Sequence, residues 1–148
     1  MTRLVVTAVL PLACVWAARH ESLILPCGVA LTPAQADQAR RLGVVHPEKV
    51  RLLQVALIPP TDRLIGRVGT KLGFVSLQTL GLTLRYGIFI QVRHWGDHPL
   101  LVHELAHVAQ YERLGGFRGF LGPYLRECNN PEYPFGELEA KRAEESCC

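Results

Sequence analysis

The stretch HPLLVHELAHVAQYER, residues 98–113, has the composition of a packed helix and carries two histidines four positions apart. Pro99 is tolerated in a first helical turn, and Gly115 is typical of a residue just after a helix end. Most residues around the histidines are uncharged, as expected for a helix that is covered on several sides. Residues at i and i+4 share one helix face, so His103 and His107 are expected to point the same way.

Two imidazole nitrogens on one face can bind a single Zn²⁺ ion. Glu104 is one position round the helix from His103, where its carboxylate can contact a metal-bound water without binding the metal. Such a water is acidified by the ion, and a carboxylate that takes its proton acts as a general base. The order and spacing therefore predict zinc at His103 and His107, with Glu104 as the catalytic residue. The alternative is a surface helix with two incidental histidines.

The motif His103-Glu-Leu-Ala-His107 resembles that of the zincin superfamily of metallopeptidases. The wider stretch to Tyr111 is similar to small bacterial proteins with predicted peptidase domains and an H-E-L-x-H-V-x-Q pattern. The similarity extends over residues 31–140, although only the helix motif is sharp. The resemblance implies a minimal zincin-like domain, in which a small sheet lies beside the motif helix. It also implies that residues 84–92 form an edge strand that lines the substrate cleft.

Zinc in such an enzyme needs a third protein ligand. One zincin branch uses a histidine six residues after the second motif histidine, but Arg113 stands there, which excludes that branch. The gluzincin branch takes a glutamate from a later helix, and Glu137-Leu-Glu-Ala140 matches the first four positions of its E-x-x-A-D pattern. The resemblance therefore implies Glu137 as the third ligand, with Glu139 as the alternative. Lys141 departs from the pattern, where the family often has an aspartate that orients a motif histidine.

Strand-like and helical segments alternate in the rest of the chain. Residues 50–58 and 76–92 are rich in branched and aromatic side chains, and Gly81 and Gly87 suggest a turn and a bulge that would make two strands of the second segment. Helices are expected at residues 33–41, 62–72, 98–113, 119–127 and 135–145. This order predicts the α+β fold class. His20 and His46 have no partner nearby and are expected on the surface.

The N-terminus begins with Arg3 and an apolar run from Leu4 to Ala18, which resembles a secretory signal peptide. Two alternatives are an N-terminal membrane anchor and a buried helix of the domain. We therefore divide the chain into residues 1–18, a signal peptide or anchor, and residues 19–148, one zincin-like metallopeptidase domain. The expected location is exported, periplasmic or extracellular, or membrane-attached, with membrane association through the N-terminal segment.

The net charge of +3 comes from scattered basic residues with acidic ones among them, so no nucleic-acid partner is expected. The predicted function is zinc-dependent hydrolysis of peptide bonds in a peptide or protein substrate. The alternative is a non-catalytic zincin-like protein that serves in binding or assembly. The intact Glu104 favours the enzyme, because a binding module has no need of that base.

Overall fold

Four short strands form one mixed sheet in the computed structural model, which describes residues 3–58, 79–127 and 136–146. Their order is β1-β2-β4-β3, with β2 and β4 parallel and the other neighbours antiparallel. The strands are β1 (Val29–Ala30), β2 (Arg51–Val55), β3 (Gly81–Leu84) and β4 (Gly87–Gln91). The described helices are α1 (Arg3–Cys27), α2 (Pro33–Arg41), α4 (His98–Arg113), α5 (Phe117–Glu127) and α6 (Glu137–Ser146), with 3-10 turns η1 (Pro47–Lys49) and η2 (Val92–His94). The α+β class is confirmed.

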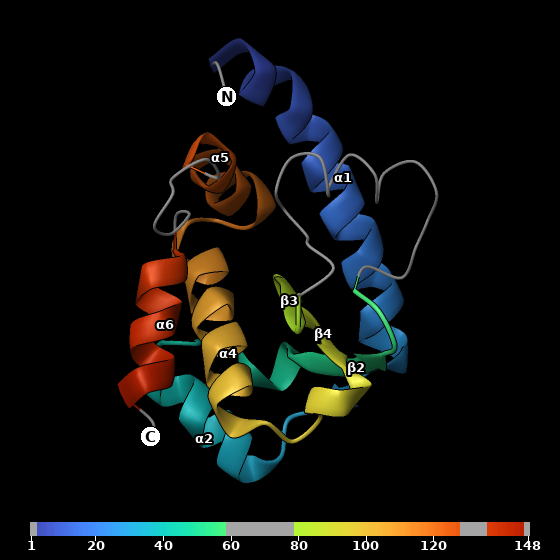
Figure 1. Cartoon of the computed structure of the whole chain (residues 1–148), viewed down its shortest axis with the longest axis vertical. Coiled ribbons are helices and arrows are strands. Elements are labelled where there is room, and N and C mark those ends of the chain that lie inside the picture. The colour runs from blue at the N-terminus through green and yellow to red at the C-terminus, as the bar shows by residue number, and fades with distance from the viewer. Residues whose placement is uncertain (1–2, 59–78, 128–135, 147–148) are drawn as a thin grey trace.

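The sheet separates two hydrophobic clusters, because successive side chains of a strand point to opposite faces. In β4, Phe89 belongs to the cluster that includes α1 and α5, whereas Ile88 and Ile90 belong to the cluster with α2 and α4. Figure 1 shows α1 along one side of the molecule, and α4 on the other with α6 beside it. The motif helix is thus held between the sheet and the C-terminal helix.

Helix ends follow the local signals in the sequence. At the start of α2, Thr32 and Gln35 form a capping box, in which each side chain bonds to the other's backbone N–H. The Asp97 side chain accepts a hydrogen bond from the Leu100 N–H at the start of α4. The bounds predicted for these two helices are confirmed, and α5 and α6 begin within two residues of the predicted positions. The helix predicted at residues 62–72 lies outside the described residues.

The segment predicted at residues 76–92 contains two strands, but its turn lies at Arg85-Tyr86 and not at a glycine. Arg85 adopts a φ of 59°, which a non-glycine residue rarely takes and which the sequence did not signal. The prediction that residues 84–92 form the edge strand is wrong. They include β4, which lies between β2 and β3, and the edge strand beside α4 is β3.

Helix α1 continues without a break past residue 18, so the predicted domain boundary falls inside it. It is the one described helix long and apolar enough to cross a membrane, although 33% of its most apolar window is buried in the fold. His20 is 3% exposed, and its Nδ1 lies 2.8 Å from the Trp16 carbonyl oxygen, so its predicted surface position is wrong. The reason is that α1 packs this part of its length on the sheet. His46 is exposed, as predicted.

Candidate metal centre

Three side chains from α4 and α6 converge at one point. The Nε2 atoms of His103 and His107 lie 3.3 Å apart, as the i, i+4 spacing on α4 predicts. Glu137, the first residue of α6, reaches between them, with one oxygen 3.2 Å from His103 Nε2 and the other 3.1 Å from His107 Nε2. One donor atom from each residue lies within 4.8 Å of the others. Two imidazoles and one carboxylate are a donor set that suits zinc, so the residues present fit the ion.

The two histidines and Glu137 shift one another's pKa values toward positive imidazoles and a negative carboxylate. Burial by itself lowers the pKa of His103, but its hydrogen bond to Glu137 and the surrounding carboxylates raise it to about 9. Burial also acts to lower the pKa of His107, but the hydrogen bond and the charge of Glu137 outweigh this effect. The pKa of His107 is therefore raised as well. Burial acts to raise the pKa of Glu137, yet its bonds to the two imidazoles lower it overall. A divalent cation bound here would replace the protons that these shifts favour on the imidazoles.

His107 is oriented by Gln110, one turn further along α4. The Gln110 Oε1 atom accepts a hydrogen bond of 2.8 Å from His107 Nδ1, which leaves Nε2 free to face Glu137. The amide nitrogen of Gln110 donates to the Gly136 carbonyl oxygen at 3.0 Å, just before α6. Gly136 has a φ of 83°, and a Cβ there would come within 2.6 Å of Gln110 Oε1. One buried amide therefore connects a metal-site histidine to the start of the helix that carries Glu137.

His103 has a carboxylate neighbour on its other nitrogen. Glu144 Oε2 lies 3.2 Å from His103 Nδ1, and Glu144 stands two helical turns after Glu137 on α6. An ionised carboxylate can only accept a hydrogen bond, so His103 Nδ1 is the donor in this contact. The contact therefore fixes the ring with Nε2 turned toward Glu137. The position at which the gluzincin pattern has an orienting aspartate is Lys141 here. Glu144, one turn further on, contacts the histidine instead.

Glu139, the alternative third ligand, contacts Arg113 and Gln110 and not the two histidines. Its carboxylate pairs with Arg113 at 3.0 and 3.3 Å and accepts a bond from Gln110 at 3.2 Å. The Arg113 hydrogen bond and charge lower its pKa. Among the glutamates of α6, Glu137 is the one that the structure brings against both Nε2 atoms, as the sequence pattern implied.

Glu104 lies beside this triad with 4% of its surface exposed. The Thr83 hydroxyl donates to its carboxylate at 2.6 Å, from the edge strand β3. A Cβ at Gly81 on the same strand would come within 2.6 Å of the carboxylate, so glycine allows this close approach. Burial raises the pKa of Glu104, opposed by the imidazole charges and the Thr83 bond. A carboxyl group with a raised pKa is suited to taking and returning a proton near neutral pH.

The triad and Glu104 lie on the wall of a cleft of about 900 Å³ between β3, α4, α5 and α6. Residues 79–84 line one wall, and α4 lines another. Part of the wall beside His107 is aromatic, where Tyr111 stacks on Phe120 and Phe120 on Tyr124. Tyr111 is nearly fully buried in the core and also lines the cleft.

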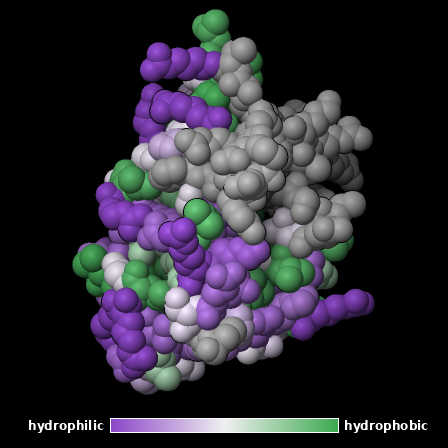
Figure 2. All heavy atoms as spheres, turned by 60° about the vertical axis from the view of Figure 1, so that its left-hand side comes forward, coloured by the Kyte–Doolittle hydropathy of each residue, from purple (hydrophilic) through white to green (hydrophobic). Residues whose placement is uncertain are grey.

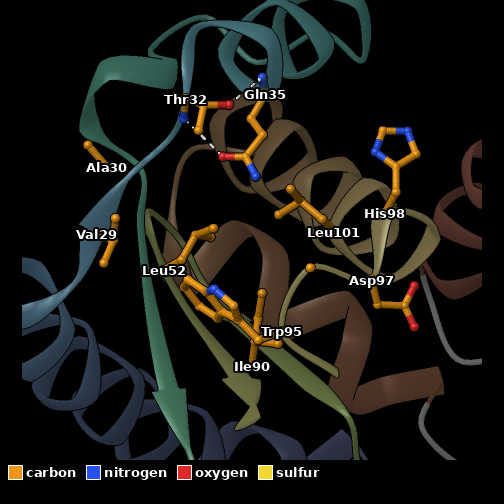
Figure 3. A pocket seen from close by; sticks show the side chains of 11 residues that line it. Val29, Ala30, Thr32, Gln35, Leu52, Ile90, Trp95, Asp97, His98 and Leu101 are labelled. Atoms are coloured by element: carbon orange, nitrogen blue, oxygen red, sulfur yellow. Dashed lines mark hydrogen bonds between the residues drawn. The ribbon is translucent and has the colours of Figure 1, made fainter. Parts of the chain in front are cut away.

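The remaining histidines do not line this cleft. His98 lines a separate pocket of about 200 Å³ near the N-terminus of α4, together with Trp95 and apolar residues from β1, β2 and β4. Figure 3 shows the His98 ring and the Asp97 carboxylate at its margin, directed away from Leu52 and Ile90. His94 Nδ1 lies 3.7 Å from the Asp97 carboxylate. His94 therefore ends η2 and His98 begins α4, and neither belongs to the triad.

Comparisons with known protein families, with curated proteins and with solved structures gave no match to this chain. The case for a metal site therefore rests on the geometry of the triad. Sequence reasoning missed three of its neighbours: Thr83, Gln110 and Glu144. The i+3 spacing from His107 could have indicated Gln110, but nothing in the sequence places Thr83 opposite Glu104.

Proposed function

We propose that this chain is a zinc-dependent peptidase in which His103, His107 and Glu137 hold the metal. The observation that carries the proposal is the convergence of these three donors beside a buried carboxylate on the wall of a large cleft. Three protein ligands leave a zinc coordination position open for water, as catalytic sites require. A purely structural zinc site is closed by a fourth protein ligand.

Glu104 is the proposed general base. Bound zinc would acidify a water molecule and polarise the carbonyl of the bond to be cut. With zinc held by the triad, Glu104 would take a proton from the attacking water and would return that proton to the leaving amine. Thr83 holds the carboxylate at 2.6 Å and restricts its rotation. Gln110 and Glu144 keep the two histidines turned toward Glu137 during this exchange.

The substrate is a peptide or protein segment bound along β3. This strand is at the edge of the described sheet and lines the cleft, so an extended peptide can pair with its backbone. Such pairing would place a peptide carbonyl between the edge strand and the metal ligands of α4. The aromatic part of the cleft wall would contact an apolar side chain of the substrate.

Cleavage of casein and of mixed fluorescence-quenched peptides tests the proposal, with zinc content measured on each sample. Zinc-loaded wild type is expected to cleave, and a chelator is expected to stop cleavage until zinc is restored. Glu104→Gln should keep zinc and lose cleavage, whereas Glu145→Gln, an exposed glutamate of α6, should behave as wild type. Zinc binding without cleavage in wild type would instead support the non-catalytic zincin-like binding or assembly protein.

A further inference from the structure

Helix α1 has two opposite faces on which apolar residues predominate, and the fold buries only one of them. The buried face packs on the sheet and on α5 and consists of Val6, Leu10, Trp16, Ala17, His20, Glu21 and Ile24. The opposite face, which we name the outer face, consists of Leu4, Val5, Ala8, Pro11, Leu12 and Val15, all exposed. These positions recur every three to four residues, so they form one continuous strip along the first half of the helix. This part of α1 projects beyond the rest of the molecule (Figure 1).

The exposed charged side chains described on α1 and on α5, the helix packed beside it, are all basic: Arg3, Arg19, Arg118 and Arg126. Arg3 directly precedes the strip in the sequence. Arg19 follows Val15 by four positions and so continues the outer face. The one acidic side chain described on these helices is Glu21, which is buried in an ion pair. By contrast, among the coloured residues on the face turned forward in Figure 2, hydrophilic side chains predominate and the apolar patches are small and separate.

Other contacts hold α1 to the domain along its second half. Arg85, at the β3–β4 turn, donates two hydrogen bonds to Glu21, at 2.9 and 2.7 Å, and the Tyr86 N–H donates a third at 3.1 Å. A helix that crosses a bilayer exposes its whole circumference to lipid or to other transmembrane segments. Crossing would therefore expose the buried face of α1 and separate Glu21 from Arg85, at the high cost of an ionised group in hydrocarbon.

From this two-sided packing we infer that α1 attaches the folded domain to the surface of an anionic phospholipid membrane. The helix lies in the plane of the membrane, its outer face enters the boundary between headgroups and acyl chains, and Arg3 and Arg19 at the two ends of the strip contact lipid phosphates. An apolar strip bordered by basic residues is the pattern of helices that bind in this way. The inference does not depend on the metal site.

Flotation of the full chain with vesicles of phosphatidylcholine, with and without phosphatidylglycerol, tests the inference. Wild type is expected to bind the anionic vesicles and to be released from membranes by alkaline carbonate. Val15→Glu should weaken binding by about tenfold or more, because it places a charge within the apolar strip. Arg19→Gln should weaken binding to anionic vesicles by about fivefold and leave binding to neutral ones unchanged.

Val92→Glu is the matched control, because Val92 is exposed to a similar extent (53% against 64% for Val15) but lies in η2, away from α1. It should bind vesicles like wild type, and all variants should keep the zinc content and thermal midpoint of wild type. Four results would overturn the inference: no binding to anionic vesicles, equal weakening by Val15→Glu and Val92→Glu, resistance of wild type to carbonate, or a mature chain that lacks residues 1–18. Loss of zinc with vesicle binding intact would overturn only the proposed function.

Discussion

Glu21 and Glu104 are both almost fully buried, with 2% and 4% of their surface exposed, yet their surroundings differ. Glu21 accepts two bonds from Arg85 and one from a backbone N–H, so its charge is neutralised by a fixed cation. Glu104 accepts one side-chain bond among the described residues, from Thr83, and lines the cleft beside two imidazoles. Burial alone therefore does not identify a functional carboxylate. The nature of its partners does, because a fixed arginine stabilises one protonation state whereas imidazoles and a cleft permit exchange.

The strongest test of this contrast is the loss of catalysis in Glu104→Gln. Removal of a general base is expected to reduce cleavage by about 10²–10⁴-fold. The amide keeps the shape of the side chain and its contact with Thr83, so the free energy of unfolding should change little. Steady-state cleavage and urea unfolding of the same preparation provide the two readouts. A large loss of stability with unchanged cleavage would reverse the roles that we assign to Glu104 and Glu21.

Glu21→Gln should show the opposite profile. It breaks a buried ion pair and leaves Arg85 without its counter-charge, which typically costs 3–5 kcal/mol of unfolding free energy. Because the Arg85 side chain is 40% exposed, we expect the low end, about 3 kcal/mol, measured by urea unfolding. The variant should keep the zinc content of wild type and the same rate of cleavage per folded molecule. A variant as stable as wild type would show that the ion pair does not hold α1 to the sheet.

Gln110→Leu tests whether the side chain of Gln110 orients His107 for zinc binding. Loss of the bond to His107 Nδ1 is expected to weaken zinc binding by about 10–100-fold, measured by competition with a chromogenic chelator. The expected effect of Glu144→Gln is smaller, because the Glu144 side chain is 40% exposed and its contact with His103 is longer. Equal zinc affinity in wild type and Gln110→Leu would contradict the role of Gln110 in holding His107.

Thr83→Val should have the smallest effect, and the size of that effect depends on pH. The Thr83 hydroxyl lowers the pKa of Glu104 against the larger effect of burial, so its removal raises that pKa further. Glu104 acts as a base only when ionised, so the acidic limb of the pH–rate profile should move to higher pH. The rate on that limb falls while the plateau at higher pH changes by less than about tenfold. A shift to lower pH would contradict this account, and Thr7→Val, on the exposed side of α1, is the isosteric control.

The parts of the fold that the sequence predicted are those decided by local signals. The starts of α2 and α4 and the i, i+4 histidines depend on residues a few positions apart, and they appear where expected. The parts that it did not predict depend on contacts distant in sequence. Arg85 turns the chain at a positive φ, and Thr83 meets Glu104 across 21 positions.

The N-terminus illustrates the same limit. Hydropathy marked residues 4–18 as apolar, which agrees with a signal sequence, an anchor or a buried helix alike. The buried His20 and the Glu21–Arg85 pair become visible only when the partner strands are in place. The removal of residues 1–18 stays a prediction.

The central claim is that His103, His107 and Glu137 form a zinc site, and elemental mass spectrometry of purified protein tests it most directly. The samples are wild type, His103→Ala, Glu137→Ala and Glu139→Ala, each supplied with zinc and desalted. Our account predicts about one zinc per chain in wild type and in Glu139→Ala, and its loss in His103→Ala and Glu137→Ala. Wild type without zinc, or zinc that is lost in Glu139→Ala and kept in Glu137→Ala, would contradict it.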